Sequence, residues 1–450
     1  MITIKKEPLI NVGILTDNKI SFELYGDFKS TLSQNTFSGR FSVEFSDKKI
    51  LLKKDDEVID TVKEIVFVPN DPSSESFLIR DVVIGVKFHW ERKEKQRFTG
   101  SLKIIVEGDE VTAINILPIE KYLVSVISSE MSAKSSLQAL KSHAIVSRSW
   151  LLAQMEKSKS IKKKNENVIT SFDTDTEHIK WYGREDHKNF DVCADDHCQR
   201  YQGITKIYTD VAIQAVEQTK GIVLINENQI CDTRYSKSCG GVSESFENVW
   251  EPVKLEYLSS IIDYKFEPEG YNLDFTSESN AVKWIKGNPS AFCNTKDPKI
   301  LSQVLLDYDQ ETTDFYRWKV EYTQEQISDL IKRKSGIDFG EIVDLEPVER
   351  GLSSRLVRLK IVGTKKTLII GKELEIRRTL SESHLYSSAF TVEKQNIVDG
   401  IPQKFVLYGG GWGHGVGLCQ IGAAVMASKG SMFDEILLHY FTNATIKKIY

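Results

Sequence analysis

A single acidic residue, Glu130, lies among mainly apolar and small side chains in the stretch from Tyr122 to Leu152. A carboxyl group in such surroundings can serve as a general acid or base. The apolar residues before it recur at three- and four-residue spacing, which predicts a short helix that ends near the acid. Ser135 and Gln138 resemble a capping box at the start of a second helix. Glu130 is therefore predicted at a corner between two helices, facing a cleft; the alternative is an exposed turn before a core helix.

Four side chains that can bind a metal follow within twelve residues: His187, Cys193, His197 and Cys198. Zinc prefers four tetrahedral nitrogen and sulfur ligands, and this His-x5-Cys-x3-His-Cys order supplies two of each. Because the neighbours His197 and Cys198 would point to opposite sides of a strand, the site requires an irregular loop. The alternative is a local disulfide or a pair of buried thiols. With six cysteines in 450 residues, the chain has too few for a disulfide framework.

Two glycine-containing segments have the composition of loops that approach a ligand closely. The first segment, Ser238 to Gly241, combines a flexible glycine pair with a hydroxyl group that can bind a polar ligand. The second segment, Gly409 to Gly417, has six glycines in nine residues around Trp412 and His414. It lacks the Gly-Lys-Ser/Thr ending of a phosphate-binding loop. We expect an aromatic platform at Trp412 and a titratable group at His414; alternatively, the first segment is a turn and the second a hinge that packs its tryptophan into the core.

At 450 residues, the chain is long enough for two or three domains with a substantial core. Charged residues make up 27% and hydrophobic residues 40%, as in an ordinary globular protein. The formal net charge of −5, without a long basic block, argues against a nucleic-acid partner. No apolar run reaches the roughly 18 to 20 residues of a membrane span, and the N-terminal stretch MITIKKEPLINVGILT lacks the apolar core of a signal peptide.

Alternating and β-branched runs dominate the first part of the chain, and helical patterns enter with the Glu130 segment. The predicted fold class is α+β, with a β-rich N-terminal region at residues 1–110 and a mixed helix and strand core at residues 111–450. The polar stretch from Ser158 to Thr170 is predicted to be a loop. Residues from about 265 to 398 alternate helices and strands without a dense group of reactive side chains, and they are predicted to be a scaffold.

Three of these segments together resemble the SpoIID/LytB family of bacterial proteins that act on cell-wall peptidoglycan. They are YLVSVISSEMSAKSSLQALKSHAIVSRSW (122–150), AVEQTKGIVLINENQICDTRYSKSCGGVSES (215–245) and GGGWGHGVGLCQIGAAVMASKG (409–430). A weaker match, RLVRLKIVGTKKTLIIGKELEIRRTL (355–380), falls in the order of the family. The resemblance covers roughly residues 111–450 and implies that they form a SpoIID-like catalytic domain that includes the scaffold.

The resemblance implies a lytic transglycosylase that cuts glycan strands already stripped of their stem peptides. Its catalytic acid would be Glu130, in the Ser-Glu-Met segment. Such an enzyme needs one carboxyl group, because the C6 hydroxyl of the sugar replaces water and closes a 1,6-anhydro ring, whereas ordinary glycosidases use two. The acid then requires a pKa raised from about 4.3 towards about 6, which burial among Tyr122, Val126 and the glycine-rich loop would supply.

The resemblance also implies a zinc site in the region from His187 to Cys198. Zinc held there by all four ligands would be structural, because no coordination position stays open for water. We further expect Trp412 to stack on a sugar ring. The other residues expected to line the cleft are Ser238, Gly240, Gly241 and His414.

Two alternatives stay open. Some LytB-type relatives are described as amidase enhancers, which would make the chain a non-catalytic wall-binding module that stimulates a partner amidase. The other alternative is a zinc-dependent hydrolase with an open metal position. The expected partners are peptidoglycan glycan strands and, for the first alternative, a cell-wall amidase. A peptidoglycan substrate predicts a cell-envelope or periplasmic location, although no signal peptide is visible in the sequence.

Overall fold

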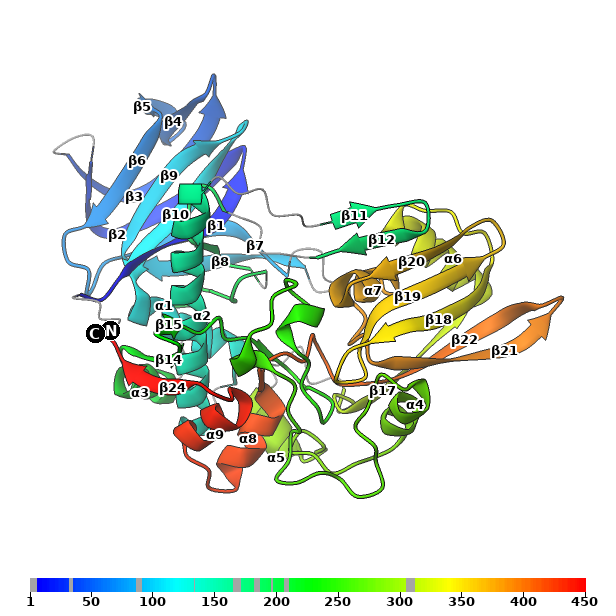
Figure 1. The fold of residues 1–450 in the computed structure, drawn as a ribbon. Coiled ribbons are helices and arrows are strands. Elements are labelled where there is room, and N and C mark those ends of the chain that lie inside the picture. The colour runs from blue at the N-terminus through cyan, green and yellow to red at the C-terminus, as the bar shows by residue number, and fades with distance from the viewer. Residues whose placement is uncertain are drawn as a thin grey trace.

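The computed structural model describes residues 6–31, 35–85, 91–132, 134–164, 171–181, 187–195, 197–205, 210–304 and 312–450, with only the backbone at 158–164. The fold is α+β, which confirms the predicted class. A large N-terminal sheet, a central group of helices and a second strand-rich part lie in succession across the molecule (Figure 1).

The N-terminal sheet has eleven strands in the described residues, ten of them from the first part of the chain. Along β2, buried and exposed side chains largely alternate, which is the period-two pattern of a sheet with one face in the core. The ten strands are β1 (Leu9–Asp17), β2 (Lys19–Ser30), β3 (Thr36–Ser46), β4 (Lys49–Lys54), β5 (Glu57–Val62), β6 (Glu64–Pro69), β7 (Ser76–Ile84), β8 (Arg92–Thr99), β9 (Ser101–Glu107) and β10 (Glu110–Pro118). Since β10 pairs with β1 and β9, the sheet extends to Pro118. The domain division near residue 110 stays a prediction.

The central helices pack around α2, which contacts α1, α3 and α9 and stands upright left of centre in Figure 1. These helices are α1 (Ile119–Glu130), α2 (Leu137–Lys164), α3 (Asp210–Gln218), α5 (Pro298–Val304), α8 (Gln420–Ser428) and α9 (Phe433–Tyr440). A small sheet of β14 (Ile222–Asn226), β15 (Gln229–Ile230) and β24 (Thr445–Lys448) lies against α2. Three short strands, β13 (Val192–Cys193), β16 (Tyr235–Ser236) and β23 (Leu418–Cys419), and the 3-10 turns η1 (Phe246–Asn248) and η2 (Glu256–Leu258) complete this part.

Two local predictions around α2 were wrong. The helix begins at Leu137, and the Oγ of Ser136, not Ser135, accepts the Ala139 N–H at 3.3 Å, while the Ser135 hydroxyl donates to the Gln303 carbonyl. The polar stretch predicted as a loop instead continues α2 to its end at residue 164, because its lysines favour helix and it contains no glycine or proline. Residues 165–170 of that stretch lie outside the described part.

A buried ion pair fixes the start of α1 against the rest of the helical group. Arg148 of α2 is fully buried and donates to both carboxylate oxygens of Glu120, at 3.0 and 2.6 Å. The Gly221 N–H and the Tyr450 hydroxyl also donate to this carboxylate, at 3.2 and 2.6 Å. These four donors satisfy the carboxylate of Glu120, whose negative charge would otherwise cost free energy to bury. The C-terminal residue therefore helps to anchor the helix that carries Glu130.

The second strand-rich part holds its own hydrophobic cluster, which includes Ile361, Ile370 and Phe405. One sheet has the order β11-β12-β20-β19-β18 and the other β17-β22-β21. Their strands are β11 (Ser171–Asp173), β12 (Glu177–Lys180), β17 (Arg317–Thr323), β18 (Ile342–Arg350), β19 (Leu356–Gly363), β20 (Thr367–Gly371), β21 (Phe390–Val398) and β22 (Ile401–Gly410). The accompanying helices are α4 (Glu278–Lys286), α6 (Gln324–Ser335) and α7 (Glu373–Thr379).

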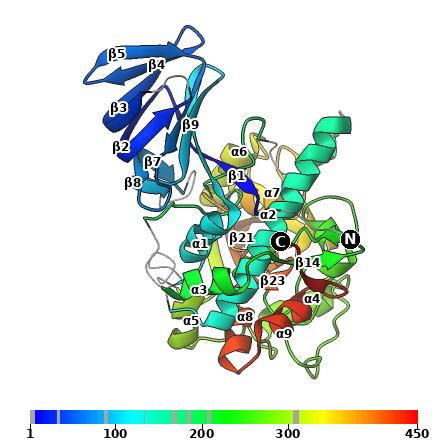
Figure 2. The same cartoon turned by 90° about the vertical axis from the view of Figure 1, so that its left-hand side faces the viewer.

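The main hydrophobic cluster is continuous from Ile10 of the N-terminal sheet to Ile449 near the C-terminus. It joins the base of the sheet to the helices, whereas β2 to β5 extend away from the helical group (Figure 2). Among the residues that the structure describes, none of the helices combines the length and apolar character that a membrane span requires.

Candidate active site and metal centre

Glu130 is the last residue of α1, and it is half-buried. The helix ends there because Met131 adopts an extended backbone, with φ −123° and ψ 148°, while its N–H still donates to the Ile127 carbonyl at 3.1 Å. Met131 is 2% exposed and belongs to the main core. Packed residues on both sides thus fix the backbone of Glu130 at the predicted corner between α1 and α2.

The carboxylate of Glu130 receives a hydrogen bond from a distant segment of the chain. The backbone N–H of Arg200 donates to Glu130 Oε1 at 3.0 Å. Two residues on, the Gln202 N–H donates to the hydroxyl of Ser125 on α1 at 3.2 Å. The segment around residue 200 therefore lies along α1 and orients its terminal acid.

Tyr201 anchors this segment between α1 and the N-terminal sheet. It is 2% exposed, its ring stacks on Tyr122 of α1 with centroids 5.0 Å apart, and its hydroxyl donates to Asn115 Oδ1 of β10 at 2.6 Å. An aromatic pair and a buried hydrogen bond each stabilise a side chain in its position by about 1 kcal/mol. Hence the backbone donor next to it is rigidly placed.

The four predicted metal ligands come together directly before this segment. One ligand atom from each of His187, Cys193, His197 and Cys198 lies within 4.8 Å of the other three. The sulfur to nitrogen distances are 3.9 Å for Cys193 to His197, 3.6 Å for Cys198 to His197 and 3.4 Å for Cys198 to His187. The loop is irregular, as expected, and β13 anchors it by pairing in parallel with β1.

These distances fit a tetrahedral zinc ion. With Zn–S of about 2.3 Å and Zn–N of about 2.05 Å, the edge between a sulfur and a nitrogen ligand is about 3.6 Å. The hydrogen bond from Cys198, followed by those from His187 and His197, lowers the pKa of Cys193 to about 2, although burial opposes the shift. Cys193 is therefore a thiolate at neutral pH, the form that binds zinc. The donor set is compatible with the metal that the family implies.

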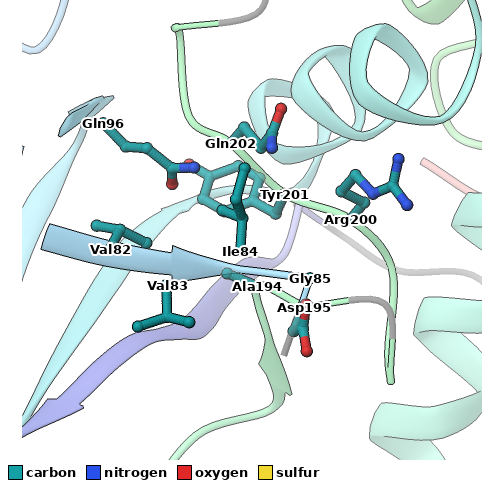
Figure 3. A pocket seen from close by; sticks show the side chains of 10 residues that line it. All are labelled: Val82, Val83, Ile84, Gly85, Gln96, Ala194, Asp195, Arg200, Tyr201 and Gln202. Atoms are coloured by element: carbon teal, nitrogen blue, oxygen red, sulfur yellow. The ribbon is translucent and has the colours of Figure 1, made fainter. Parts of the chain in front are cut away.

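A small pocket lies beside this loop, between β7, β8 and the segment around residue 200 (Figure 3). Its volume of 10 Å³ leaves room for about one water molecule, so it cannot take a sugar ring. The amide of Gln96 lines it, is fully buried and has no hydrogen-bond partner among the described residues. Of the predicted site residues, none lines this pocket.

The two glycine-containing segments lie against each other. Ser238 and Trp412 exchange two backbone hydrogen bonds, of 3.1 and 2.7 Å. Gly240 has φ +81°, and a Cβ there would come within 2.9 Å of the backbone nitrogen of Gly411, so this approach requires glycine. Ser238, Gly240 and Gly241 are all buried. The structure gives these three residues a packing role, and their contact with a substrate stays a prediction.

Trp412 lies among other aromatic rings. It stacks on Tyr386 with centroids 4.0 Å apart and planes 20° apart, and it lies 4.7 Å from the ring of Phe315. The indole is half-buried. A sugar would therefore meet only the part of the ring that these neighbours leave uncovered, and the stacking role also stays a prediction.

His414 is a neutral histidine in this site. Burial, and then the positive charge of Arg234, hold its pKa well below the ordinary value. Its Nδ1 accepts the Val416 N–H at 3.0 Å, which places the proton of the neutral ring on Nε2. The ring meets Trp250 edge-on, with centroids 5.2 Å apart. His414 can thus donate a hydrogen bond but carries no charge at neutral pH.

The Glu130 corner and the first glycine segment meet at the end of α5. The Ser132 N–H donates to the Gln303 carbonyl at 3.2 Å, and the Lys237 ammonium donates to the neighbouring Val304 carbonyl at 3.5 Å. Segments that are more than a hundred residues apart in the sequence therefore converge on two adjacent residues. This convergence places the cationic group of Lys237 on the same side of the molecule as the Glu130 corner.

Sequence reasoning missed two features of the site region. The backbone N–H of Arg200 has no side-chain signature, so only the folded chain reveals it as the donor to Glu130. A second group of metal-binding side chains comes from four separate segments, and no local spacing indicates it. Its members are Cys239, Asp263, Cys293 and Cys419.

Comparison with known proteins gives matches along most of the chain. Residues 107–226 match the family described as Stage II sporulation protein (SpoIID), and residues 244–417 match a Domain of unknown function (DUF8618). An uncharacterized protein of Brachyspira hyodysenteriae (strain ATCC 49526 / WA1) is 26% identical over 349 residues, which cover 78% of this chain and 72% of that protein.

Two named relatives come from Bacillus. The Amidase enhancer of Bacillus subtilis (strain 168) is 25% identical over 244 residues, which cover 52% of this chain but 32% of that protein. Stage II sporulation protein D of Bacillus amyloliquefaciens is 22% identical over 336 residues, which cover 75% and 76% of the two chains.

The SpoIID match and these relatives support the assignment of the chain to the SpoIID/LytB family, as the resemblance predicts. The Glu130 corner, the His/Cys loop and the Arg200 donor all fall within the matched residues 107–226. These relatives support a cell-wall-related role.

Proposed function

We propose that the chain is a lytic transglycosylase that cleaves peptide-stripped peptidoglycan strands, with Glu130 as its single acid and base. The observation that carries this proposal is the placement of Glu130. It ends a packed helix, it is half-buried, and it accepts a hydrogen bond from the Arg200 N–H, which directly follows the His/Cys loop. A proton-transfer group needs a fixed position relative to the bond that it cleaves.

The reaction balances with this one carboxyl group. Protonated Glu130 donates its proton to the glycosidic oxygen as the bond from that oxygen to C1 breaks. The resulting carboxylate takes the proton of the C6 hydroxyl of the same sugar, and the C6 oxygen bonds to C1. The products are a new chain end and a 1,6-anhydro sugar; Glu130 is again protonated, and no water is consumed. A glycosidase that uses water needs a second carboxylate instead.

The proposed zinc ion would be held by His187, Cys193, His197 and Cys198. Bound there, it supplies a structural cross-link, because four protein ligands leave no open position for water or substrate. The cross-link fixes the loop immediately before Arg200. Through that residue, the metal site positions Glu130 and does not touch the substrate. This arrangement speaks against a zinc-dependent hydrolase.

A second candidate function is that of a wall-binding module that stimulates a cell-wall amidase. It is favoured by the relative named Amidase enhancer, which aligns with 52% of this chain. This function would leave Glu130 without a chemical role. Both candidates act on the cell wall and place the chain in the cell envelope.

The test compares wild type with Glu130→Gln, which keeps the shape of the side chain and removes its acid. Glu217→Gln is the matched control, because Glu217 is exposed on α3. Each protein is incubated with peptidoglycan pre-treated with an amidase, and the released sugars are identified by mass spectrometry. Wild type and the control should release 1,6-anhydro sugars, and the Glu130 variant should release about 10²-fold to 10⁴-fold less.

Equal release by the Glu130 variant would refute the catalytic role. If none of the proteins releases sugar, yet all bind the glycan and stimulate an amidase, the enhancer function is correct. Chelation gives a separate check on the zinc-dependent hydrolase: loss of turnover from a protein with unchanged stability would identify an open, catalytic metal.

A further inference from the structure

A second cluster of metal-binding side chains lies in the core, away from the His/Cys loop. The Sγ atoms of Cys239, Cys293 and Cys419 and a carboxylate oxygen of Asp263 all lie within 4.8 Å of one another. Each of the four residues is at most 2% exposed. All three cysteines are free thiols. We call this group the Cys/Asp cluster.

The spacing of the sulfur atoms fits ligands of one ion. Cys239 Sγ and Cys293 Sγ are 3.7 Å apart. Two thiolates bound to the same tetrahedral zinc at about 2.3 Å are separated by about 3.8 Å. A disulfide would instead require a bond of about 2.05 Å. The cluster is thus close to the geometry that a metal ion would impose.

Hydrogen bonds outside the cluster orient its members. Asp263 accepts the Tyr440 hydroxyl on Oδ1 at 2.6 Å and the Cys293 N–H on Oδ2 at 2.9 Å. The sulfur of Cys419 accepts the Cys239 N–H at 3.3 Å. Donors of this kind, which fix a ligand without occupying its position towards the centre, accompany metal sites. Among the described residues, no basic side chain forms an ion pair with the buried Asp263, so its ionised form requires another positively charged partner.

Positive charge near the cluster can offset the negative charge that remains after a divalent ion has bound. Three thiolates and a carboxylate carry four negative charges, of which zinc neutralises two. Arg355 is fully buried and donates to the Cys239 carbonyl at 3.1 Å; among the described residues, its hydrogen bonds all go to uncharged oxygen atoms. Cys419 lies at the N-terminus of α8, where the helix dipole stabilises a thiolate.

We propose that Cys239, Asp263, Cys293 and Cys419 bind a second structural zinc ion. Thiolate-rich tetrahedral sites select zinc among the common divalent ions, and four protein ligands exclude a catalytic water. The ion ties the first glycine segment, which holds Cys239, to Cys419, which follows the second glycine segment by two residues. It therefore holds together the two segments that pair through Ser238 and Trp412. The proposal does not depend on the proposed activity.

The test counts zinc in the purified, untagged chain by mass spectrometry of the metal, after a wash with a weak chelator. Wild type should hold two zinc ions per chain. Cys193→Ser/Cys198→Ser should hold one, Cys293→Ser should hold one, and the triple variant none. The control is Cys231→Ser, since Cys231 is buried to 1% and lies outside both clusters; it should keep two.

X-ray absorption at the zinc edge then identifies the ligands. The ion that remains in Cys193→Ser/Cys198→Ser should have three sulfur neighbours and one oxygen neighbour. One zinc per wild-type chain, with none in this double variant, would overturn the proposal. So would a wild-type mass lower by two hydrogens together with a Cys239 to Cys293 cross-linked peptide, because it would show a disulfide in place of the metal.

The count in wild type decides the matter even where a variant fails to fold. Two ions per chain support a second site. No ion excludes it, and so does one ion whose X-ray absorption shows two sulfur and two nitrogen neighbours, the ligand set of the His/Cys loop. Asp263→Asn serves as a milder variant, because it keeps the size of the side chain and all three thiols. It should reduce the zinc content after the chelator wash from two ions towards one; an unchanged content of two would remove Asp263 from the ligand set.

Discussion

The His/Cys loop and the Cys/Asp cluster use similar side chains in opposite ways. In the loop, four ligands lie within twelve residues and are partly exposed, and the segment that follows them orients Glu130. In the cluster, the ligands are fully buried and come from four segments, with Cys239 and Cys419 separated by 180 positions. A local set can order one loop, whereas a dispersed set can form only when the core around it has folded. The loop should therefore govern activity and the cluster stability.

The largest expected effect concerns stability. Cys293→Ala removes one ligand of the Cys/Asp cluster and leaves the other buried charges without their ion, so the free energy of unfolding should fall by about 3 to 5 kcal/mol. Cys231→Ala, at a similarly buried cysteine outside the clusters, should cost about 1 to 2 kcal/mol. Denaturant unfolding of both variants measures the difference. Equal losses of unfolding free energy in the two variants would show that the Cys/Asp cluster does not stabilise the fold through an ion.

The second prediction concerns activity, for which the loop variant should show the larger loss. Cys198→Ser should lower the rate of glycan cleavage by about 10²-fold, because a disordered loop displaces the Arg200 N–H and misplaces Glu130. Cys293→Ser should change the rate of the folded protein by less than about tenfold. The rates are compared at a temperature where both variants remain folded. A larger loss in Cys293→Ser would contradict the division of roles.

The third prediction uses pH to probe the packing next to the Cys/Asp cluster. His143 contacts Gln420, which follows Cys419, and burial, then the charge of Lys237, lowers the His143 pKa to about 3. The unfolded chain binds a proton near pH 6.5 and the folded chain does not, so stability is complete above that pH and declines as the pH falls towards 3. Between pH 7 and pH 5, this group should cost about 2 kcal/mol.

His143→Gln removes that titration and serves as the comparison. Its free energy of unfolding should fall by about 2 kcal/mol less than that of wild type between pH 7 and pH 5. Loss of zinc at low pH affects both proteins, so the difference between them isolates the histidine. An identical pH dependence would show that folding does not lower the pKa of His143.

The smallest expected effect concerns the backbone N–H that Arg200 donates to Glu130. Arg200→Pro removes the N–H that donates to the carboxylate, and glycan cleavage should fall by about tenfold, as for one lost hydrogen bond to a charged group. Arg200→Ala keeps the N–H and is the matched control, with an expected change below about threefold. Steady-state rates of the two variants decide. A similar loss in both would assign the effect to the side chain.

Local patterns in the sequence were enough for much of this description. The family, the α+β class and the helix that ends at Glu130 followed from apolar spacing and motif order. The grouping of His187, Cys193, His197 and Cys198 followed from their short separation, and the structure brings them together. Each of these features depends on residues that are close in the chain.

The features that escaped prediction depend on long-range packing. The capping box at Ser135 was wrong because tertiary contact draws that hydroxyl to Gln303. The Cys/Asp cluster and the Arg200 donor exist only after distant segments meet. The pairing of Ser238 with Trp412, which buries the first glycine segment, also joins residues far apart in the chain, while the role of the glycine segments in lining a cleft stays a prediction. The spacing of residues along the chain does not indicate such contacts between distant segments.

The most direct test of the single-acid mechanism asks whether water enters the product. Cleavage of peptide-stripped glycan is run in water labelled with ¹⁸O, and the new reducing ends are analysed by mass spectrometry. The account predicts 1,6-anhydro ends without ¹⁸O, because the C6 hydroxyl replaces water. Reducing ends that each carry one ¹⁸O would contradict it, since they would require a hydrolytic water and a second group to activate that water.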